Sequence, residues 1–171
     1  MSMSIPQVEQ CPPMHALVLT RRCKIWQMPK LMQEGYPQLF AAVEAQGIAT
    51  AGMPFAHYLN LDWPRLTQAM WFAKLWGFFT QDWHLEMAVP LVRKPQAQNG
   101  LRAVTYPACE AVTVLHHGTY GSMVNSYQAL YRWLKGQGFK PANECFEFYL
   151  NDPQDTQPEE LQTRILVPIR R

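Results

Sequence analysis

The stretch YQALYRWLKGQGFKPANECFEFYLN, residues 127–151, decides the fold because a second version of it lies earlier in the chain. Residues 36–60, YPQLFAAVEAQGIATAGMPFAHYLN, align with it at a constant offset of 91 and without a gap. Nine of the 25 aligned positions are identical, whereas unrelated sequences would match at roughly one or two. Further on, AVPL (88–91) aligns with LVPI (166–169) at an offset of 78, so the first copy is 13 residues longer there. We therefore expect an internal duplication.

Each copy predicts the same order of secondary-structure elements. Apolar residues between Tyr127 and Leu134 recur at helical spacing, and Gly136 and Gly138 are typical of the end of a helix. The fold class is therefore α+β, with two tandem β-α-β-β modules related by pseudo-twofold symmetry. We expect strands at 15–20, 110–117, about 144–150 and about 162–169.

The two copies are expected to form one domain spanning residues 1–171, from repeats at about 14–92 and 101–171. Residues 93–106 connect them and are predicted to hold a short strand around 101–105. A β-α-β-β unit covers one face of its sheet with a helix and leaves the other bare, and two units can bury these faces against each other. We expect a ligand cleft between the copies.

Composition narrows the class of partner. The chain of 171 residues has a formal charge of only +2 and no run of Lys or Arg, which argues against direct nucleic-acid binding. Charged residues make up 16%, below the usual quarter, and aromatic residues 12%. Aromatic side chains in such number are typical of a pocket or an interface.

The cysteines and the absence of targeting signals favour a soluble, cytoplasmic protein. Cys11, Cys23, Cys109 and Cys145 show no CxxC spacing, and we expect reduced thiols. We find no signal peptide and no apolar run long enough to span a bilayer, so no membrane association is expected.

The strand around residue 147 raises the question of function. Phe146, Phe148 and Leu150 alternate with Glu147 and Tyr149, so the two sets lie on opposite faces. We expect the apolar set to pack under the helix, and Glu147 and Tyr149 to face the cleft. The alternative is a solvated strand face, with Glu147 in water or paired with an arginine such as Arg164.

Several stretches together resemble the GyrI-like small-molecule-binding family, which includes effector-binding domains of AraC-type regulators. The resemblance covers nearly the whole chain from about residue 14. It implies the tandem fold, a ligand cleft, and a buried acidic residue that holds cationic aromatic ligands, which maps onto Glu147. The matching stretches are YPA (106–108), HHGTY (116–120), YQALYRWLKGQGF (127–139), FEFYLNDP (146–153) and LQTRILVPI (161–169), with GMPFAHY (52–58) and EMAVPL (86–91) in the first copy.

The candidate site combines this acid with aromatic residues. Tyr58 and Tyr149 occupy equivalent positions in the two copies, and Tyr120 follows Gly118 in a turn. The aromatic-rich segment 62–83 is expected to be a lid, a dimer interface or a satellite core. The candidate ligand-binding residues are Glu147, Tyr149, Tyr58, Trp71, Trp76 and Tyr120.

The sequence favours a binding protein, which bacteria could use to sense or sequester small hydrophobic, cationic aromatic compounds. The alternative is a hydrolase of strained-ring or alkylating natural products in the same cleft, because the resemblance includes such members; an inhibitor of a large enzyme is a third class. No nucleophile–base pair or cofactor fingerprint is visible, and we expect no cofactor.

Metal and DNA binding are not expected either. His116 and His117 are neighbours on a strand and point to opposite faces, so structural roles are favoured over a shared metal ion. The predicted elements leave no stretch for a helix-turn-helix. Either a homodimer or a separate regulatory partner is compatible with the sequence.

Overall fold

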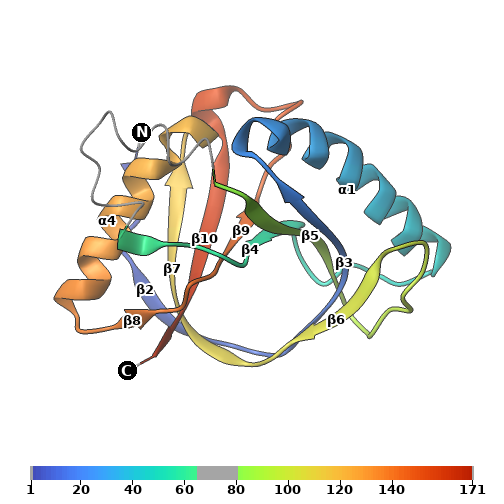
Figure 1. Ribbon diagram of the computed structural model, residues 1–171, viewed down its shortest axis with the longest axis horizontal. Coiled ribbons are helices and arrows are strands. Elements are labelled where there is room, and N and C mark those ends of the chain that lie inside the picture. The colour runs from blue at the N-terminus through green and yellow to red at the C-terminus, as the bar shows by residue number, and fades with distance from the viewer. Residues whose placement is uncertain (1, 65–80, 171) are drawn as a thin grey trace.

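The structure is a computed structural model that describes residues 2–64 and 81–170 (Figure 1). In these residues ten strands form one sheet, in the order β1-β7-β10-β9-β4-β5-β3-β6, while β2 also pairs with β7 and β8 with β10. All of the pairings are antiparallel. The strands are β1 (Ser2–Met3), β2 (Gln7–Cys11), β3 (Met14–Cys23), β4 (Phe55–Tyr58), β5 (Trp83–Leu91), β6 (Arg102–Tyr106), β7 (Cys109–His117), β8 (Lys140–Pro141), β9 (Cys145–Tyr149) and β10 (Gln162–Arg170).

Two long helices flank the central strands. They are α1 (Met28–Ala45) and α4 (Met123–Gly136), each preceded by a short 3-10 helix, η1 (Ile25–Gln27) or η2 (Tyr120–Ser122); a third, η3 (Pro158–Glu160), precedes β10. Figure 1 shows α1 and α4 on either side of β4 and β9, with the curled sheet continuing beneath them. The mixed α+β class is confirmed, with the sheet forming an antiparallel half-barrel.

The order of elements follows the sequence prediction. Among the described residues, the long helices and the strands of the first half follow the order β3-α1-β4-β5, and those of the second half the order β7-α4-β9-β10, with the two-residue β8 between α4 and β9. The short strand expected in the connection is β6. Two strands, β1 and β2, precede the first strand that the sequence predicted.

The two halves meet edge to edge rather than face to face, which corrects the expected packing. Strand β4 pairs directly with β9, and in this ladder Ala56 faces Glu147 while Phe55 faces Phe148. Pairing two edge strands satisfies their backbone hydrogen-bonding groups and makes one continuous sheet. Ala56 and Glu147 are themselves related by the repeat offset, since 56 + 91 = 147.

The register of the outer strands supports the duplication. Ala56 faces Met87 on β5, and Glu147 faces Ile165 on β10. Met87 and Ile165 differ by 165 − 87 = 78, which is the offset that the sequence gives for this region. The twofold superposition of the two halves stays a prediction.

Both helices pack on the same face of the sheet. Leu39 of α1 and Leu130 of α4 are fully buried there, in one cluster with Cys145 of β9. Phe146 lies in a separate cluster on the opposite face, with Phe148 packed against it. The expectation that these two phenylalanines pack under the helix was therefore wrong. The face with Glu147 and Tyr149 is the one that the helices cover.

The helix ends repeat as well. The C-cap residue that follows each helix is a glutamine, Gln46 or Gln137, with a helical backbone conformation. Each is followed by a glycine with positive φ, 57° at Gly47 and 76° at Gly138. This left-handed conformation ends a helix and strongly favours glycine.

The four cysteines are free thiols. Among the described helices, none is long and apolar enough to cross a bilayer.

The equivalence of the two cores can be tested at Leu39 and Leu130, which the repeat aligns. Each Leu→Ala change should lower the free energy of unfolding by about 2–5 kcal/mol, because a fully buried side chain is lost. Urea denaturation would measure both, with the exposed Val124→Ala as a control that changes little. A cost at one leucine only would show that the two halves do not pack equivalently.

Candidate functional site

A buried carboxylate lies at the centre of the sheet, between the two halves. Glu147 is only 6% exposed and sits on the helix-covered face of β9. Tyr58 donates a hydrogen bond to its Oε2 at 3.2 Å and Tyr149 to the same oxygen at 3.1 Å. Tyr127 of α4 donates to Oε1. Residues from both halves therefore hold one carboxylate.

The environment of Glu147 opposes its ionisation. Burial raises the pKa of this carboxyl above its ordinary value, and the hydrogen bonds from Tyr127, Tyr149 and Tyr58 lower it without cancelling that effect. A buried carboxylate is costly to charge unless a counter-charge lies close by. No cationic side chain among the described residues forms an ion pair with Glu147. When charged, the Glu147 carboxylate therefore has no counter-charge from an ion pair among the described residues.

A row of tyrosine rings runs from this carboxylate toward the surface. The Tyr36 ring meets that of Tyr149 edge to face at 6.2 Å, and Tyr120 meets Tyr149 in the same way at 5.8 Å. Tyr120 is 42% exposed. Burial and the charge of Glu147 raise the pKa of both Tyr36 and Tyr120, which places all three groups in one electrostatic environment.

The structure brings together part of the predicted site. Tyr58 and Tyr149 contact Glu147 directly, whereas Tyr120 contacts only the Tyr149 ring. Trp71 and Trp76 lie outside the described residues. The alternative pairing of Glu147 with Arg164 is wrong, since Arg164 pairs with Glu9.

The tryptophans that border segment 62–83 are buried. The Trp63 ring stacks on Tyr131 at 5.7 Å, and its Nε1 donates to the Ala142 carbonyl at 2.7 Å. Trp83 meets Tyr58 edge to face at 5.9 Å. These contacts attach the two ends of the segment to α4, to the loop before β9 and to Tyr58, which donates a hydrogen bond to Glu147.

Sequence reasoning missed two tyrosines of this site, Tyr127 and Tyr36. Tyr127 was assigned only to the apolar stripe of a helix, and Tyr36 counted only as the identical residue at the equivalent position of the repeat. The signal was available, because a tyrosine kept at the same helical position in both copies carries a hydroxyl that a pure core does not need.

A second charged cluster lies on the opposite face of the same strand pair. His57 of β4 is 3% exposed, with its Nδ1 3.0 Å from Glu86 Oε2 and its Nε2 2.8 Å from Glu144 Oε2. Arg102 and Tyr106 of β6 donate to Glu86 at 3.0 and 2.9 Å. The imidazole also stacks on Phe146, with ring centroids 4.0 Å apart. The sequence did not indicate this cluster.

The groups of this second cluster favour their charged forms. Burial alone would lower the pKa of His57, but the hydrogen bonds and charges of Glu144 and Glu86 outweigh it and raise that pKa. Burial would raise the pKa of Glu86, yet His57, Tyr106 and Arg102 hold it below its ordinary value. The hydrogen bond from His57 also lowers the pKa of Glu144. The cluster is a charge-compensated network that joins the two halves.

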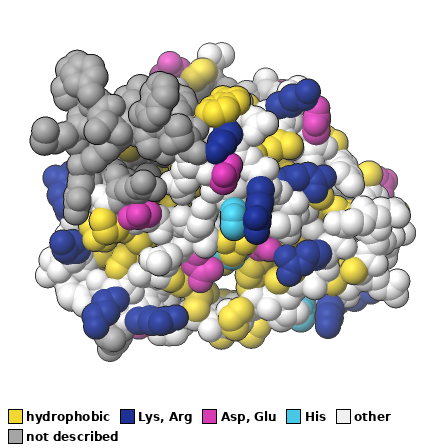
Figure 2. Space-filling model, viewed as in Figure 1, with side chains coloured by type: hydrophobic (Ala, Val, Ile, Leu, Met, Phe, Trp, Pro, Cys, Tyr) yellow, Lys and Arg dark blue, Asp and Glu magenta, His cyan; other side chains and the backbone are white. Residues whose placement is uncertain are grey.

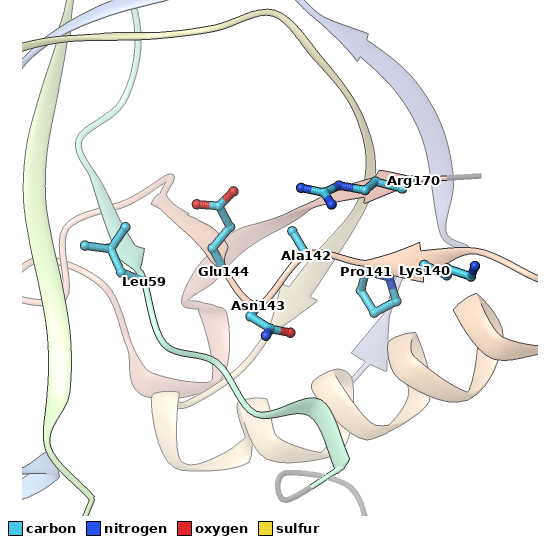
Figure 3. A pocket seen from close by; sticks show the side chains of 7 residues that line it. All are labelled: Leu59, Lys140, Pro141, Ala142, Asn143, Glu144 and Arg170. Carbon is cyan, nitrogen blue, oxygen red and sulfur yellow. The ribbon is translucent and has the colours of Figure 1, made fainter.

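A hollow of about 420 Å³ adjoins Glu144 (Figure 3). In Figure 3 the carboxylate of Glu144 and the guanidinium of Arg170 face each other across it. The hollow contains none of the predicted ligand-binding residues. Its lining residues are Leu59, Lys140, Pro141, Ala142, Asn143, Glu144 and Arg170.

Charged side chains of both signs share the face shown in Figure 2, where those of Lys and Arg lie among acidic and neutral ones.

The structural role expected for His116 is confirmed. Its ring is fully buried, and its nitrogens lie 2.8 Å from Ser126 Oγ and 3.1 Å from Ser122 Oγ. These contacts fix the start of α4, the helix that carries Tyr127.

Comparison with known proteins agrees with this geometry. A family profile described as "GyrI-like small molecule binding domain" matches residues 5–170. A search of curated protein sequences finds no significant match.

Solved structures give the same fold. The crystal structure of the EcmrR C-terminal domain is 19% identical, with a TM-score of 0.75, and the match covers 98% of each chain. In the complex of EcmrR with DNA, this chain spans 57% of the EcmrR chain, at 18% identity and a TM-score of 0.76. At these identities the likeness concerns the fold alone.

Two further structures with this fold are a hydrolase and a protein solved with a bound cation. A hydrolase from Listeria innocua is 13% identical, with a TM-score of 0.64, and the match covers 96% of this chain and 91% of that one. SAV2435, solved with bound tetraphenylphosphonium, is 10% identical, with a TM-score of 0.58, and the match covers 98% of this chain and 94% of that one.

The buried carboxylate makes a prediction about stability. Because the pKa of Glu147 is raised in the folded state, charging it disfavours folding as pH rises from the ordinary value of 4.5 through the folded pKa. Glu147→Gln has no such titration. The free energy of unfolding of the wild type, minus that of the variant, should fall across this range and then level off. Urea denaturation over a pH series measures it, and a flat difference would contradict a raised pKa.

The His57 network should stabilise the fold when its groups are charged, whereas Glu147 should destabilise it when charged. Its stabilisation should be largest between the ordinary pKa values of 4.5 and 6.5, because the two carboxylates and the imidazolium are then all charged. It should fade as pH rises through the raised pKa of His57, or falls through the lowered pKa values of Glu86 and Glu144. In that window, His57→Gln should cost about 1.5–3 kcal/mol of unfolding free energy, since Glu86 and Glu144 lose their charge-assisted hydrogen bonds to the imidazolium. Denaturation above the His57 pKa should show a smaller cost, and an equal cost at both pH values would contradict the network.

Proposed function

This chain belongs to the GyrI-like small molecule binding domain family, and on that premise we propose that it binds small, hydrophobic, cationic aromatic molecules at Glu147. The observation that carries the proposal is a buried carboxylate at the junction of two halves, held by three tyrosine hydroxyls and without an ion-pair partner among the described residues. The proposed ligand-binding residues are Glu147, Tyr58, Tyr127, Tyr149, Tyr36 and Tyr120.

The chemistry of such a site favours a flat cation. Burying about 300–400 Å² of apolar ligand surface contributes roughly 7–10 kcal/mol before association costs, and each ring face near the positive centre adds about 0.5–2 kcal/mol. The ion pair with Glu147 mainly selects the sign of the charge, because desolvation offsets much of its attraction. Binding in the micromolar range, about −8 kcal/mol, is the expected outcome.

The neighbour SAV2435, which shares the fold and was solved with a cationic tetraaryl ligand, is consistent with this proposal. The likeness to a domain of a DNA-bound regulator, EcmrR, fits a role in sensing or sequestering such compounds.

A hydrolytic reaction at the same place has less support. Cys145 is the nucleophile nearest to Glu147 in sequence, and its thiol lies 3.2 Å from the Tyr127 hydroxyl. Burial and the charge of Glu147 raise the pKa of this thiol well above its ordinary value, and a protonated, buried thiol is a poor nucleophile. We therefore favour reversible binding.

Replacing Glu147 by Gln keeps its size and removes its charge. Tetraphenylphosphonium should bind the variant at least about tenfold more weakly, because the cation loses its partner in a desolvated site. The neutral triphenylmethane should change little or bind better. For the wild type, cation affinity should fall as pH drops through the raised Glu147 pKa, since protonation removes the anion.

Tryptophan fluorescence titration would measure these affinities. The exposed Val124→Ala serves as the matched control and should leave both affinities unchanged. Equal losses for the cation and the neutral compound, or no loss for either, would show that Glu147 does not select charge.

A further inference from the structure

The Tyr36 hydroxyl stands out among the polar groups of the site. Its oxygen is buried and has no hydrogen-bond partner, although the residue lies in the middle of α1, beside the Tyr149 ring. Buried polar groups in native proteins are paired in the great majority of cases, and an unpaired one destabilises the fold. A phenylalanine would fill the same space without this cost, so the hydroxyl calls for an explanation.

The repeat explains why the partner is missing. Tyr36 is equivalent to Tyr127, and Ala56 is equivalent to Glu147, at the same offset of 91. Tyr127 donates its proton to Glu147. In the aligned first half, the residue at the position of that carboxylate is Ala56, whose methyl group cannot accept a hydrogen bond. One half of the site thus has both a tyrosine and its acceptor, and the other has the tyrosine alone.

The surrounding hydroxyls do not supply the acceptor. Tyr58, Tyr127 and Tyr149 each direct a proton to Glu147, and none lies within hydrogen-bonding distance of the Tyr36 oxygen. The charge of Glu147 nevertheless contributes to the raised pKa of Tyr36. Tyr36 in turn contributes to the raised pKa values of Tyr58 and Tyr149, so these groups lie close together. A group that meets Tyr36 would therefore occupy the same site as a cation at Glu147.

We propose that the ligand of this site carries, besides its positive charge, a hydrogen-bond acceptor that takes the proton of Tyr36. Carbonyl, ether and hydroxyl oxygens are of this class. The acceptor occupies the place where the first half lacks a carboxylate, and the cationic, aromatic part faces Glu147. This inference rests on the proposed function and narrows its ligand class from any hydrophobic cation to a cation with an acceptor oxygen on its first-half side.

Two matched phosphonium ions test the proposal. (4-Benzoylphenyl)triphenylphosphonium and (4-benzylphenyl)triphenylphosphonium have the same charge and nearly the same size, and they differ by a carbonyl in place of a methylene. Wild-type protein should bind the benzoyl compound roughly threefold to tenfold more tightly, which is the gain typical of one net hydrogen bond. In Tyr36→Phe the preference should disappear through weaker binding of the benzoyl compound, with the benzyl compound unaffected.

Tyr131→Phe is the matched control, because it removes a tyrosine hydroxyl from the other helix, at a ring that stacks on Trp63. It should keep the full preference. Thermal unfolding provides a second readout, since Tyr36→Phe should be at least as stable as wild type if its hydroxyl has no partner in the protein. A clear loss of stability would overturn the inference, as would equal binding of both compounds by wild type, or a preference that survives in Tyr36→Phe. If neither phosphonium binds, the proposed function itself fails, and this inference with it.

Discussion

The rest of the structure depends on one constraint: a carboxylate must be kept in a place where water does not reach it. Glu147 lies at the middle of the central strand pair, and within the described part of the chain its hydrogen bonds come from tyrosine hydroxyls of both halves of the sheet. Tyr127 reaches it from a helix, Tyr149 from its own strand and Tyr58 from the partner strand. The three neutral donors reduce the free-energy cost of burying this carboxylate, but they do not supply a positive charge. The pKa of Glu147 therefore stays above its ordinary value.

Buried ionisable groups lie on both faces of the β4–β9 pair, in different environments. The inner face is the one that the helices cover, and the outer face is opposite to it. On the outer face His57 lies between Glu86 and Glu144; the two carboxylates raise the pKa of His57, and His57 lowers the pKa of each carboxylate, so all three favour the charged form. On the inner face burial shifts the pKa of Glu147 toward the neutral form. Since alternate residues of a strand point to opposite faces, the compensated network stiffens the strands next to the uncompensated carboxylate. Such support favours a site whose hydroxyls are already in position when a ligand arrives.

The sequence predicted local features of this structure better than contacts between distant segments of the chain. The order of helices and strands and the glycine that follows each helix were predicted from local pattern and from the repeat, whereas Glu147 was singled out by the family resemblance. The edge-to-edge union of β4 and β9 did not, because hydrophobic alternation shows that a strand has two faces but not which face the helix covers. That ambiguity placed Phe146 and Phe148 on the wrong side. The roles of Tyr127 and Tyr36 were missed for a related reason, since helical spacing alone marks a tyrosine as core and does not show what its hydroxyl meets.

The sequence repeat aligns residues of the two halves that meet at the centre of the sheet, and the proposed cation site uses a position at which the aligned residues differ. The direct pairing of Ala56 with Glu147 puts the break on the line where the halves meet. Two glutamates at these facing positions would repel each other across the strand pair and would raise the cost of burial further. Two alanines would leave no charge for a cation to meet. One of each gives a single negative charge, with a small side chain beside it, while the equivalent tyrosines Tyr36 and Tyr127 remain on both helices. Under the proposed function, the charge selectivity of the site would follow from this one facing pair, in which only one of the two aligned positions carries a carboxylate.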